Sequence, residues 1–200
     1  MFGTDYLELI AVPKGATSGR IDLLNYPFGL NGLVFGSEDS TITFNELSKA
    51  GVVPYGRVYY CHHFTRDLVW RDEWRHHDNG VVAVVRALIV EPDPAGGARL
   101  YADMFGDEAV RDIKDGKRVV IGNSRFDIVT EAALKAEFGD AAPDAQGRTA
   151  YMAGLTLRTL SLPKAAHALE DGKIAGVIEK ANRLVVPAKQ ALNAVLEFVE

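Results

Sequence analysis

The stretch VVAVVRALIVEPDPAGGARLYADMFG (81–106) decides the fold. Its first ten residues (81–90) are almost all apolar and rich in valine, a composition that favours a β-strand. Asp93 can then cap a helix, Pro94 suits the first helical position, and Gly106 suits the helix end. The sequence therefore predicts a strand followed directly by a helix.

The same order of elements recurs when residues 81–130 are laid over residues 150–200. The second copy opens with an apolar run (150–159) and continues with SLPKAAHALEDG, in which Ser161 is the expected helix cap. Three short strand candidates then follow in each copy: AVRDI, KRVVIG and SRFDIVT in the first, AGVIEK, RLVVPA and AVLEFVE in the second. Each copy therefore predicts a β-α-β-β-β unit, and two such units can cover each other's sheets.

We expect residues 81–200 to form a paired βαβββ domain of the α+β class around a concave sheet. The segment between the two copies (130–148) predicts a helix followed by a linker that contains Pro and Gly. Residues 1–80 are less regular, and we expect them to hold reduced or truncated copies of the same unit. The abrupt start MFGTDYLELI resembles the middle of such a unit and indicates a shortened chain.

Three strand candidates support this expectation for the first 80 residues. Residues 5–12 (DYLELIAV) alternate like a half-buried final strand. Residues 29–52 indicate a strand and then a helix that stops at Gly51, and residues 56–64 (GRVYYCHHF) indicate a further strand.

Composition limits the classes of partner. The 200 residues are 48% hydrophobic and 24% charged, which suffices for a folded core. No run approaches the roughly 18 apolar residues that cross a bilayer, and the start lacks a secretory signal, so we expect a cytoplasmic protein with no membrane partner. Cys61 stands alone, which agrees with a reducing compartment. A net charge of -5 argues against nucleic acid and favours a small-molecule ligand.

The chain resembles the glyoxalase-like branch of the vicinal oxygen chelate (glyoxalase/bleomycin resistance/dioxygenase) superfamily, whose members consist of tandem βαβββ modules. Residues 59–80, 90–106 and 183–200 carry the resemblance most strongly. It implies a concave mixed or antiparallel sheet with incomplete N-terminal modules. In that superfamily the final strand of a module commonly presents a metal-binding glutamate to the cavity, and the first strand commonly presents a histidine.

Acidic residues stand at the final-strand positions that the resemblance indicates: Glu8, Asp127 and Glu197. Burying a carboxylate is expensive without a metal, a cation or several hydrogen bonds, which makes a cavity-facing role a functional hypothesis. Strand alternation leaves the solvated face as the alternative. The first-strand positions fall on Arg86, Gly154 and Gly32, and none of these is a histidine. This departure disfavours a conventional paired metal site.

Two candidate sites follow. Glu8, His63 and Glu197 could offer carboxylates and an imidazole to a divalent metal such as Zn, Fe, Ni or Mn, and a cavity without metal stays equally open. Arg86 could pair with Asp127 or Glu197, or bind an anionic substrate beside them, with an ordinary salt bridge as the alternative. No catalytic residue can be singled out.

Three functions remain open on this reasoning. The first is a metal-dependent lyase, isomerase or dioxygenase acting on a small molecule, which the strand carboxylates favour. The second is a non-catalytic protein that binds and sequesters a small molecule, and the third is a degenerate structural or interaction module. The absent first-strand histidines favour the last two. Sheet edges left open by missing strands predict a homodimer.

Overall fold

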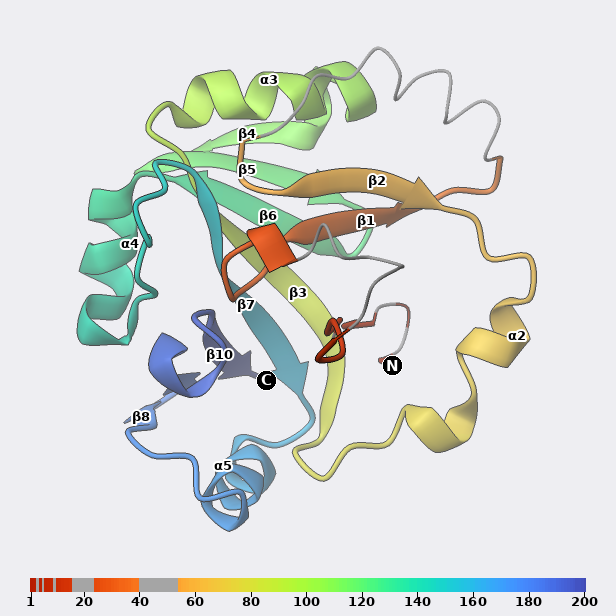
Figure 1. Ribbon diagram of the computed structural model, residues 1–200, viewed down its shortest axis with the longest axis vertical. Helices are drawn as coiled ribbons and strands as arrows, with labels where there is room; N and C mark the ends of the chain where they lie inside the picture. The colour runs from red at the N-terminus through yellow and green to blue at the C-terminus, as the bar shows by residue number, and fades with distance from the viewer. Residues whose placement is uncertain (3, 5, 9, 16–23, 40–53) are drawn as a thin grey trace.

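A computed structural model describes residues 1–200 except residues 3, 5, 9, 16–23 and 40–53. An eight-stranded sheet with the strand order β4-β5-β6-β3-β7-β10-β9-β8 forms its centre (Figure 1). The strands of this sheet are β3 (Val81–Val90), β4 (Val110–Ile113), β5 (Gly116–Ile121), β6 (Ser124–Val129), β7 (Tyr151–Thr159), β8 (Ile178–Lys180), β9 (Arg183–Val186) and β10 (Val195–Val199).

The sheet consists of two βαβββ modules. One runs through β3, α3 (Pro94–Phe105), β4, β5 and β6, and the other through β7, α5 (Leu162–Asp171), β8, β9 and β10. The first and last strands of each module are parallel neighbours, and β3 and β7 join the modules in antiparallel pairing. The remaining neighbours are antiparallel. This topology confirms the expected α+β fold of tandem βαβββ modules with a mixed sheet.

The helices begin where the sequence predicts. The Asp93 side chain accepts a hydrogen bond from the backbone N–H of Ala95 at 3.2 Å, and Pro94 opens α3. Ser161 caps α5 in the same way. The helix α4 (Glu131–Phe138) links the modules and is capped by Thr130. The described residues also include short 3-10 helices, among them η2 (Asp72–Trp74), η3 (Asp107–Ala109), η4 (Gly139–Ala141) and η5 (Ala188–Gln190).

The sheet has an outer and an inner face. On the outer face, Tyr101 of α3 packs in one apolar cluster with Phe126, and Ala165 of α5 packs in another with Leu155. We call the opposite side, which points away from α3 and α5, the inner face. Leu134 and Phe138 of α4 lie in a third cluster with inner-face residues of β3, β6, β9 and β10: Leu88, Val90, Val129, Val185 and Val195. The helix α4 therefore covers part of the inner face.

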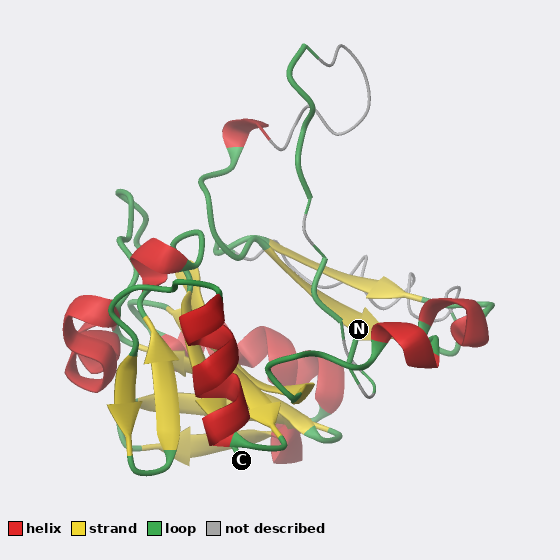
Figure 2. Cartoon of the chain, turned by 90° about the horizontal axis from the view of Figure 1, so that it is seen from below, coloured by secondary structure: helices red, strands yellow, loops and turns green. Residues whose placement is uncertain are grey.

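The N-terminal part of the chain packs against the outer face of the first module. Its strands β1 (Gly32–Gly36) and β2 (Arg57–Cys61) form a separate parallel pair, which confirms two of the expected strands. Partly buried side chains from this pair lie against the α3 cluster, and Leu30 forms a bridge to Met152. A short helix, α2 (Arg66–Val69), follows β2. Figure 2 shows this part to one side of the sheet, where the N-terminus is marked.

One predicted strand is wrong. The described residues between 5 and 12 adopt no strand, and Leu7 and Ile10 are 43% and 52% exposed, because no neighbouring strand pairs with this segment. The helix predicted before Gly51 falls outside the described residues. No helix in the described part of the chain has the length and apolar character needed to cross a membrane.

Candidate functional site

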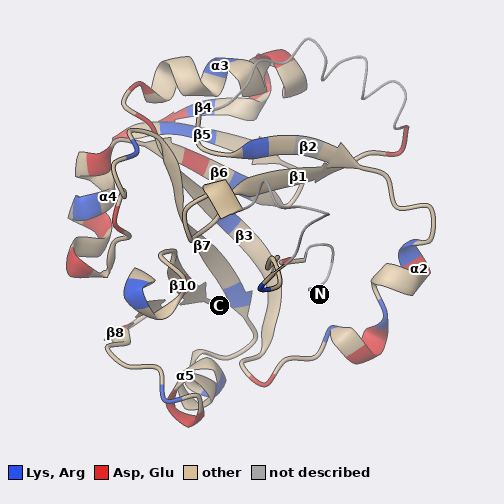
Figure 3. Cartoon of the chain, viewed as in Figure 1, with Lys and Arg blue, Asp and Glu red and all other residues tan. Residues whose placement is uncertain are grey.

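One row of side chains crosses the inner face where the two modules meet. Strand register places Arg125 of β6 beside Arg86 of β3. Arg86 in turn lies beside Thr156 of β7, which lies beside Glu197 of β10. The row therefore joins the first and last strands of both modules. Figure 3 shows basic and acidic bands close together on β5, β6 and β3.

Arg86 is the centre of a buried network of ion pairs. Its Nη1 and Nη2 donate to the two carboxylate oxygens of Glu137 at 2.8 and 3.0 Å. Its Nε lies 2.7 Å from Oδ2 of Asp127, an ion-pair distance, although the N–H lacks hydrogen-bond geometry. Nη1 is also 4.0 Å from Oε2 of Glu197. The buried residue Arg86, which is 8% exposed, thus serves three carboxylates.

The carboxylate of Asp127 is fully buried and receives a second arginine. Nε and Nη2 of Arg118, on the neighbouring strand β5, donate to its two oxygens at 2.7 and 2.9 Å. The hydrogen bond to Asp127 is the main reason that the pKa of Arg118 is raised. Such bidentate pairing fixes the position of both side chains.

Glu197 has an equivalent arrangement in the second module. Oγ1 of Thr156 donates to its Oε2 at 2.7 Å, and Nη1 of Arg183, on β9, pairs with its Oε1. In both modules an acid on the last strand therefore pairs with an arginine on the strand before it. The two modules therefore repeat this acid–arginine pair as well as the order of their strands and helices.

The charges of the network balance. Arg86, Arg118 and Arg183 face Asp127, Glu137 and Glu197. Burial acts to lower the pKa of Arg86, but its pairing with Glu137, Asp127 and Glu197 outweighs burial and leaves that pKa raised. The central guanidinium therefore remains charged, and a buried, paired cation holds the carboxylates together.

This donor set does not fit the divalent metal that the family resemblance implies. A guanidinium has no lone pair to offer a metal, and Arg86 stands between the carboxylates that would have to converge on one. Within the described residues, no three His, Cys, Asp or Glu side chains are grouped so as to hold a metal ion. The cation at this site is an arginine.

The structure does not bring together the predicted metal ligands Glu8, His63 and Glu197. Glu8 is exposed in irregular backbone ahead of β1. The His63 ring lies against Tyr6 and Trp70, with ring centroids 5.8 and 5.0 Å away. Both residues belong to the N-terminal part, which packs on the outer face, whereas Glu197 points to the inner face.

The structure does bring together Arg86, Asp127 and Glu197, the three residues expected to bind substrate. The partners that sequence reasoning missed are Thr156, Arg118, Arg125, Arg183 and Glu137. Arg118 and Arg183 could have been found, since each lies in the third strand of its repeat. Arg118 directly precedes the valine pair 119–120, and Arg183 stands two positions before the valine pair 185–186. Glu137 carries no such signal, because only the packing of α4 places it here.

Arg125 differs from the other arginines of the row. Its Nε is buried and has no hydrogen-bond partner among the described residues. No ion pair of its guanidinium occurs among those residues either, although Arg86 lies directly beside it in register. Arg125 is thus a positive group with an unused buried donor.

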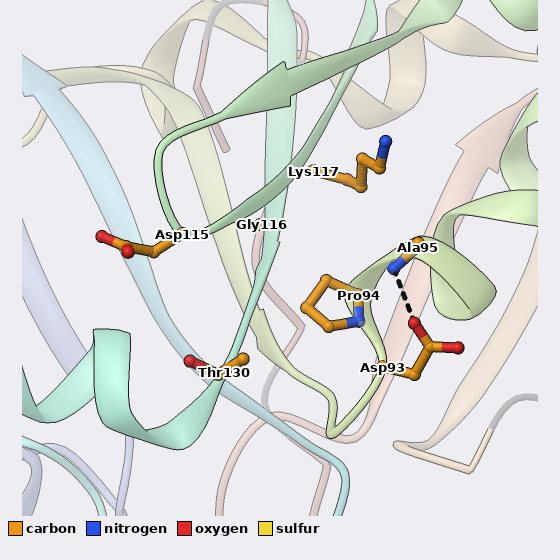
Figure 4. A pocket seen from close by; sticks show the side chains of 7 residues that line it. All are labelled: Asp93, Pro94, Ala95, Asp115, Gly116, Lys117 and Thr130. Atoms are coloured by element: carbon orange, nitrogen blue, oxygen red, sulfur yellow. Dashed lines mark hydrogen bonds between the residues drawn. The ribbon is translucent and has the colours of Figure 1, made fainter.

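A pocket of about 330 Å³ lies elsewhere, between the start of α3 and the β4–β5 turn (Figure 4). Three of its polar side chains already serve the local structure. Asp93 caps α3, Thr130 caps α4, and Lys117 pairs with Asp112. Gly116 has to be a glycine because a Cβ there would lie 2.1 Å from the Ile128 carbonyl oxygen. We therefore place the candidate site on the inner face and not in this pocket.

Comparison with known proteins adds a distant likeness in fold. No protein family matches the sequence, and no curated protein does either. Among solved structures, methylmalonyl-CoA epimerase from Mycobacterium tuberculosis is similar, with a TM-score of 0.44 and 14% identity. The alignment covers 62% of this chain and 91% of that one. A similarity of this degree carries no argument about function, which has to come from the inner-face network.

Proposed function

We propose that this protein binds a small molecule on the inner face without a metal ion and without catalysing a reaction. The observation that supports this is the position of Arg86 between Asp127, Glu137 and Glu197. In a metal-dependent member of this fold, carboxylates on the equivalent strands would converge on a divalent cation. Here they converge on a guanidinium that is charged and fixed.

The engagement of the carboxylates also argues against acid–base catalysis by the network. A general base needs a lone pair within reach of the substrate proton. Both oxygens of Asp127 accept from Arg118, and both oxygens of Glu137 accept from Arg86. Glu197 accepts from Thr156 and Arg183. Each carboxylate is thus committed to holding the network together, which suits binding better than proton transfer.

The outer members of the network supply the contact surface. The side chains of Arg118, Arg183 and Glu137 are 33%, 21% and 30% exposed, whereas that of Asp127 is 1% exposed. A ligand on the inner face would touch these partly exposed groups, whose positions the buried pairs fix. Fixed side chains lower the entropic cost of binding.

A degenerate structural module is the second candidate, and one observation favours it. Leu134 and Phe138 of α4 are 0% and 7% exposed and occupy inner-face surface between the two modules. The balanced ion pairs and this helix together could serve folding alone, since a complete network needs no ligand.

A ligand screen at constant ionic strength, with and without EDTA, tests the proposed function. We expect at least one small molecule to raise the melting temperature in a saturable way, with the same affinity in both conditions. The matched pair of variants is Arg118→Gln on the inner face and Arg99→Gln on the exposed surface of α3, and only the first should weaken binding. Binding that EDTA abolishes would contradict the proposal, and a complete absence of binding would favour the structural module.

A further inference from the structure

The inner face carries a surplus of positive charge, although the whole chain has a net charge of -5. Strand alternation and register place every arginine of the eight-stranded sheet, all of which the structure describes, on this one face. These arginines are Arg86, Arg111, Arg118, Arg125, Arg158 and Arg183. On the same face these strands carry only two acidic residues, Asp127 and Glu197, and α4 adds a third, Glu137. The remaining acids of these strands, Asp112 and Glu179, alternate to the outer face.

The surplus resides in three arginines that have no carboxylate partner among the described residues: Arg111, Arg125 and Arg158. Arg111 and Arg158 are exposed, so water can serve them as it serves most surface arginines. Arg125 is only partly exposed, and its Nε is buried and finds no acceptor in the described part of the chain. Leaving a buried donor unpaired costs stability, and folded proteins retain such donors where a ligand, an ion or a water molecule completes them.

The nearest carboxylate cannot complete Arg125. Asp127 lies two residues further along β6 on the same face, but Arg118 holds both of its oxygens and Arg86 contacts one of them. Arg86 lies next to Arg125 in register, but as a cation already paired with Asp127 and Glu137 it offers Arg125 no acceptor. An anionic ligand group beside the partly exposed Arg125 would supply the partner that its guanidinium lacks.

We propose that Arg125 anchors a carboxylate or phosphate group of the small molecule that binds the inner face. The planar guanidinium presents parallel N–H donors that match either group. Arg158 lies two residues beyond Thr156 on β7, two strands away from Arg125, and is exposed, so it could pair with a second anionic group of the ligand. This inference rests on the proposed function and specifies its ligand class.

Titration calorimetry with inorganic pyrophosphate and with citrate, at constant ionic strength, tests the anchor. We expect saturable binding of at least one probe to the unaltered protein, and the probe that binds distinguishes phosphate from carboxylate. Arg125→Gln should weaken that binding by at least tenfold, whereas Arg125→Lys, which retains the charge, should weaken it less. Arg99→Gln removes an exposed positive charge from α3 and should leave it unchanged.

Two outcomes would overturn the anchor. One is equal binding by Arg125→Gln and the unaltered protein. The other is no binding of either probe to the unaltered protein, which would indicate that water and not a ligand accepts the hydrogen bond of Arg125. Neither outcome contradicts metal-free binding in general, because an uncharged ligand found in the EDTA screen would still support it. Far-UV circular dichroism of each variant separates loss of binding from loss of folding.

Discussion

Arg86 and Glu137 are joined by two parallel hydrogen bonds of 2.8 and 3.0 Å across 51 residues of sequence. The pair ties the last turn of α4 to the middle of β3. Leu134 and Phe138 bury the apolar side of the same helix on the inner face. The ion pair and the apolar packing therefore hold α4 in place together. Substitution of Arg86 should reduce the stability of the protein more than substitution of a surface arginine.

Replacement of Arg86 by methionine should destabilise the protein by about 3–5 kcal/mol, the usual cost of removing one partner from a buried ion pair. The variant would leave three carboxylates without their shared cation. Urea unfolding measures the loss, and Arg99→Met on the exposed surface of α3 should change stability by no more than about 0.5 kcal/mol. Equal stability of the two variants would show that the network contributes nothing.

A divalent cation should partly replace the missing guanidinium. In Arg86→Ala the carboxylates of Asp127, Glu137 and Glu197 would surround a vacated volume, and Mn²⁺ prefers such oxygen ligands. We expect Mn²⁺ to raise the melting temperature of this variant and to leave that of the unaltered protein unchanged. The double variant Arg86→Ala, Glu197→Gln should respond less. An identical response of all three proteins would refute the idea that Arg86 takes the place of a metal ion.

Much of this architecture follows from the sequence, for identifiable reasons. The valine-rich strand before Asp93 and its counterpart before Ser161 predict both modules, because caps and prolines fix the helix starts. The acids Asp127 and Glu197 stand out because they interrupt apolar strands.

The remaining features depend on tertiary contacts. Sequence spacing pointed to Gly154 as the first-strand position, whereas the bulged register of β3 and β7 places Thr156 beside Arg86. Gly154 is required for packing instead, since a Cβ there would lie 2.3 Å from the Val195 carbonyl oxygen. The strand predicted around Glu8 does not form, because residues that alternate in polarity form a strand only where a neighbouring strand pairs with them. No sequence pattern indicates that Glu137 reaches Arg86.

Glu91, at the end of β3, predicts a pH dependence of stability. Its burial, and secondarily the charge of Asp93, raise its pKa above the usual 4.5. The folded state then holds the proton more tightly than the unfolded state, so this residue lowers stability as the pH rises above about 4.5. Glu91→Gln should therefore raise the melting temperature at pH 7 and have little effect at pH 4.

The exposed residue Glu179 provides the control for that experiment. Glu179→Gln should leave the melting temperature nearly unchanged at both pH values. A Glu91→Gln effect that is the same at pH 4 and pH 7 would show that ionisation of Glu91 is not its cause.

The hydroxyl pair of Tyr55 and Tyr101 joins the N-terminal part to α3. Both side chains are buried and their hydroxyl groups share a hydrogen bond. Burial raises the pKa of Tyr101 to about 12. Tyr55→Phe or Tyr101→Phe would leave one buried hydroxyl unpaired at a cost of about 1–3 kcal/mol, measured by urea unfolding. The double variant should cost less than the sum of the two, and strict additivity would argue against the pair.

The metal content of the purified protein tests the central claim most directly, namely that Arg86 provides the cation of the inner face. The protein should be prepared without chelator and without a metal-affinity tag, and analysed by elemental mass spectrometry beside the Glu8→Gln, Glu197→Gln double variant. We expect far less than one transition-metal ion per chain in both. Close to one ion per chain in the unaltered protein, lost in the double variant, would contradict the account and restore the metal-dependent enzyme.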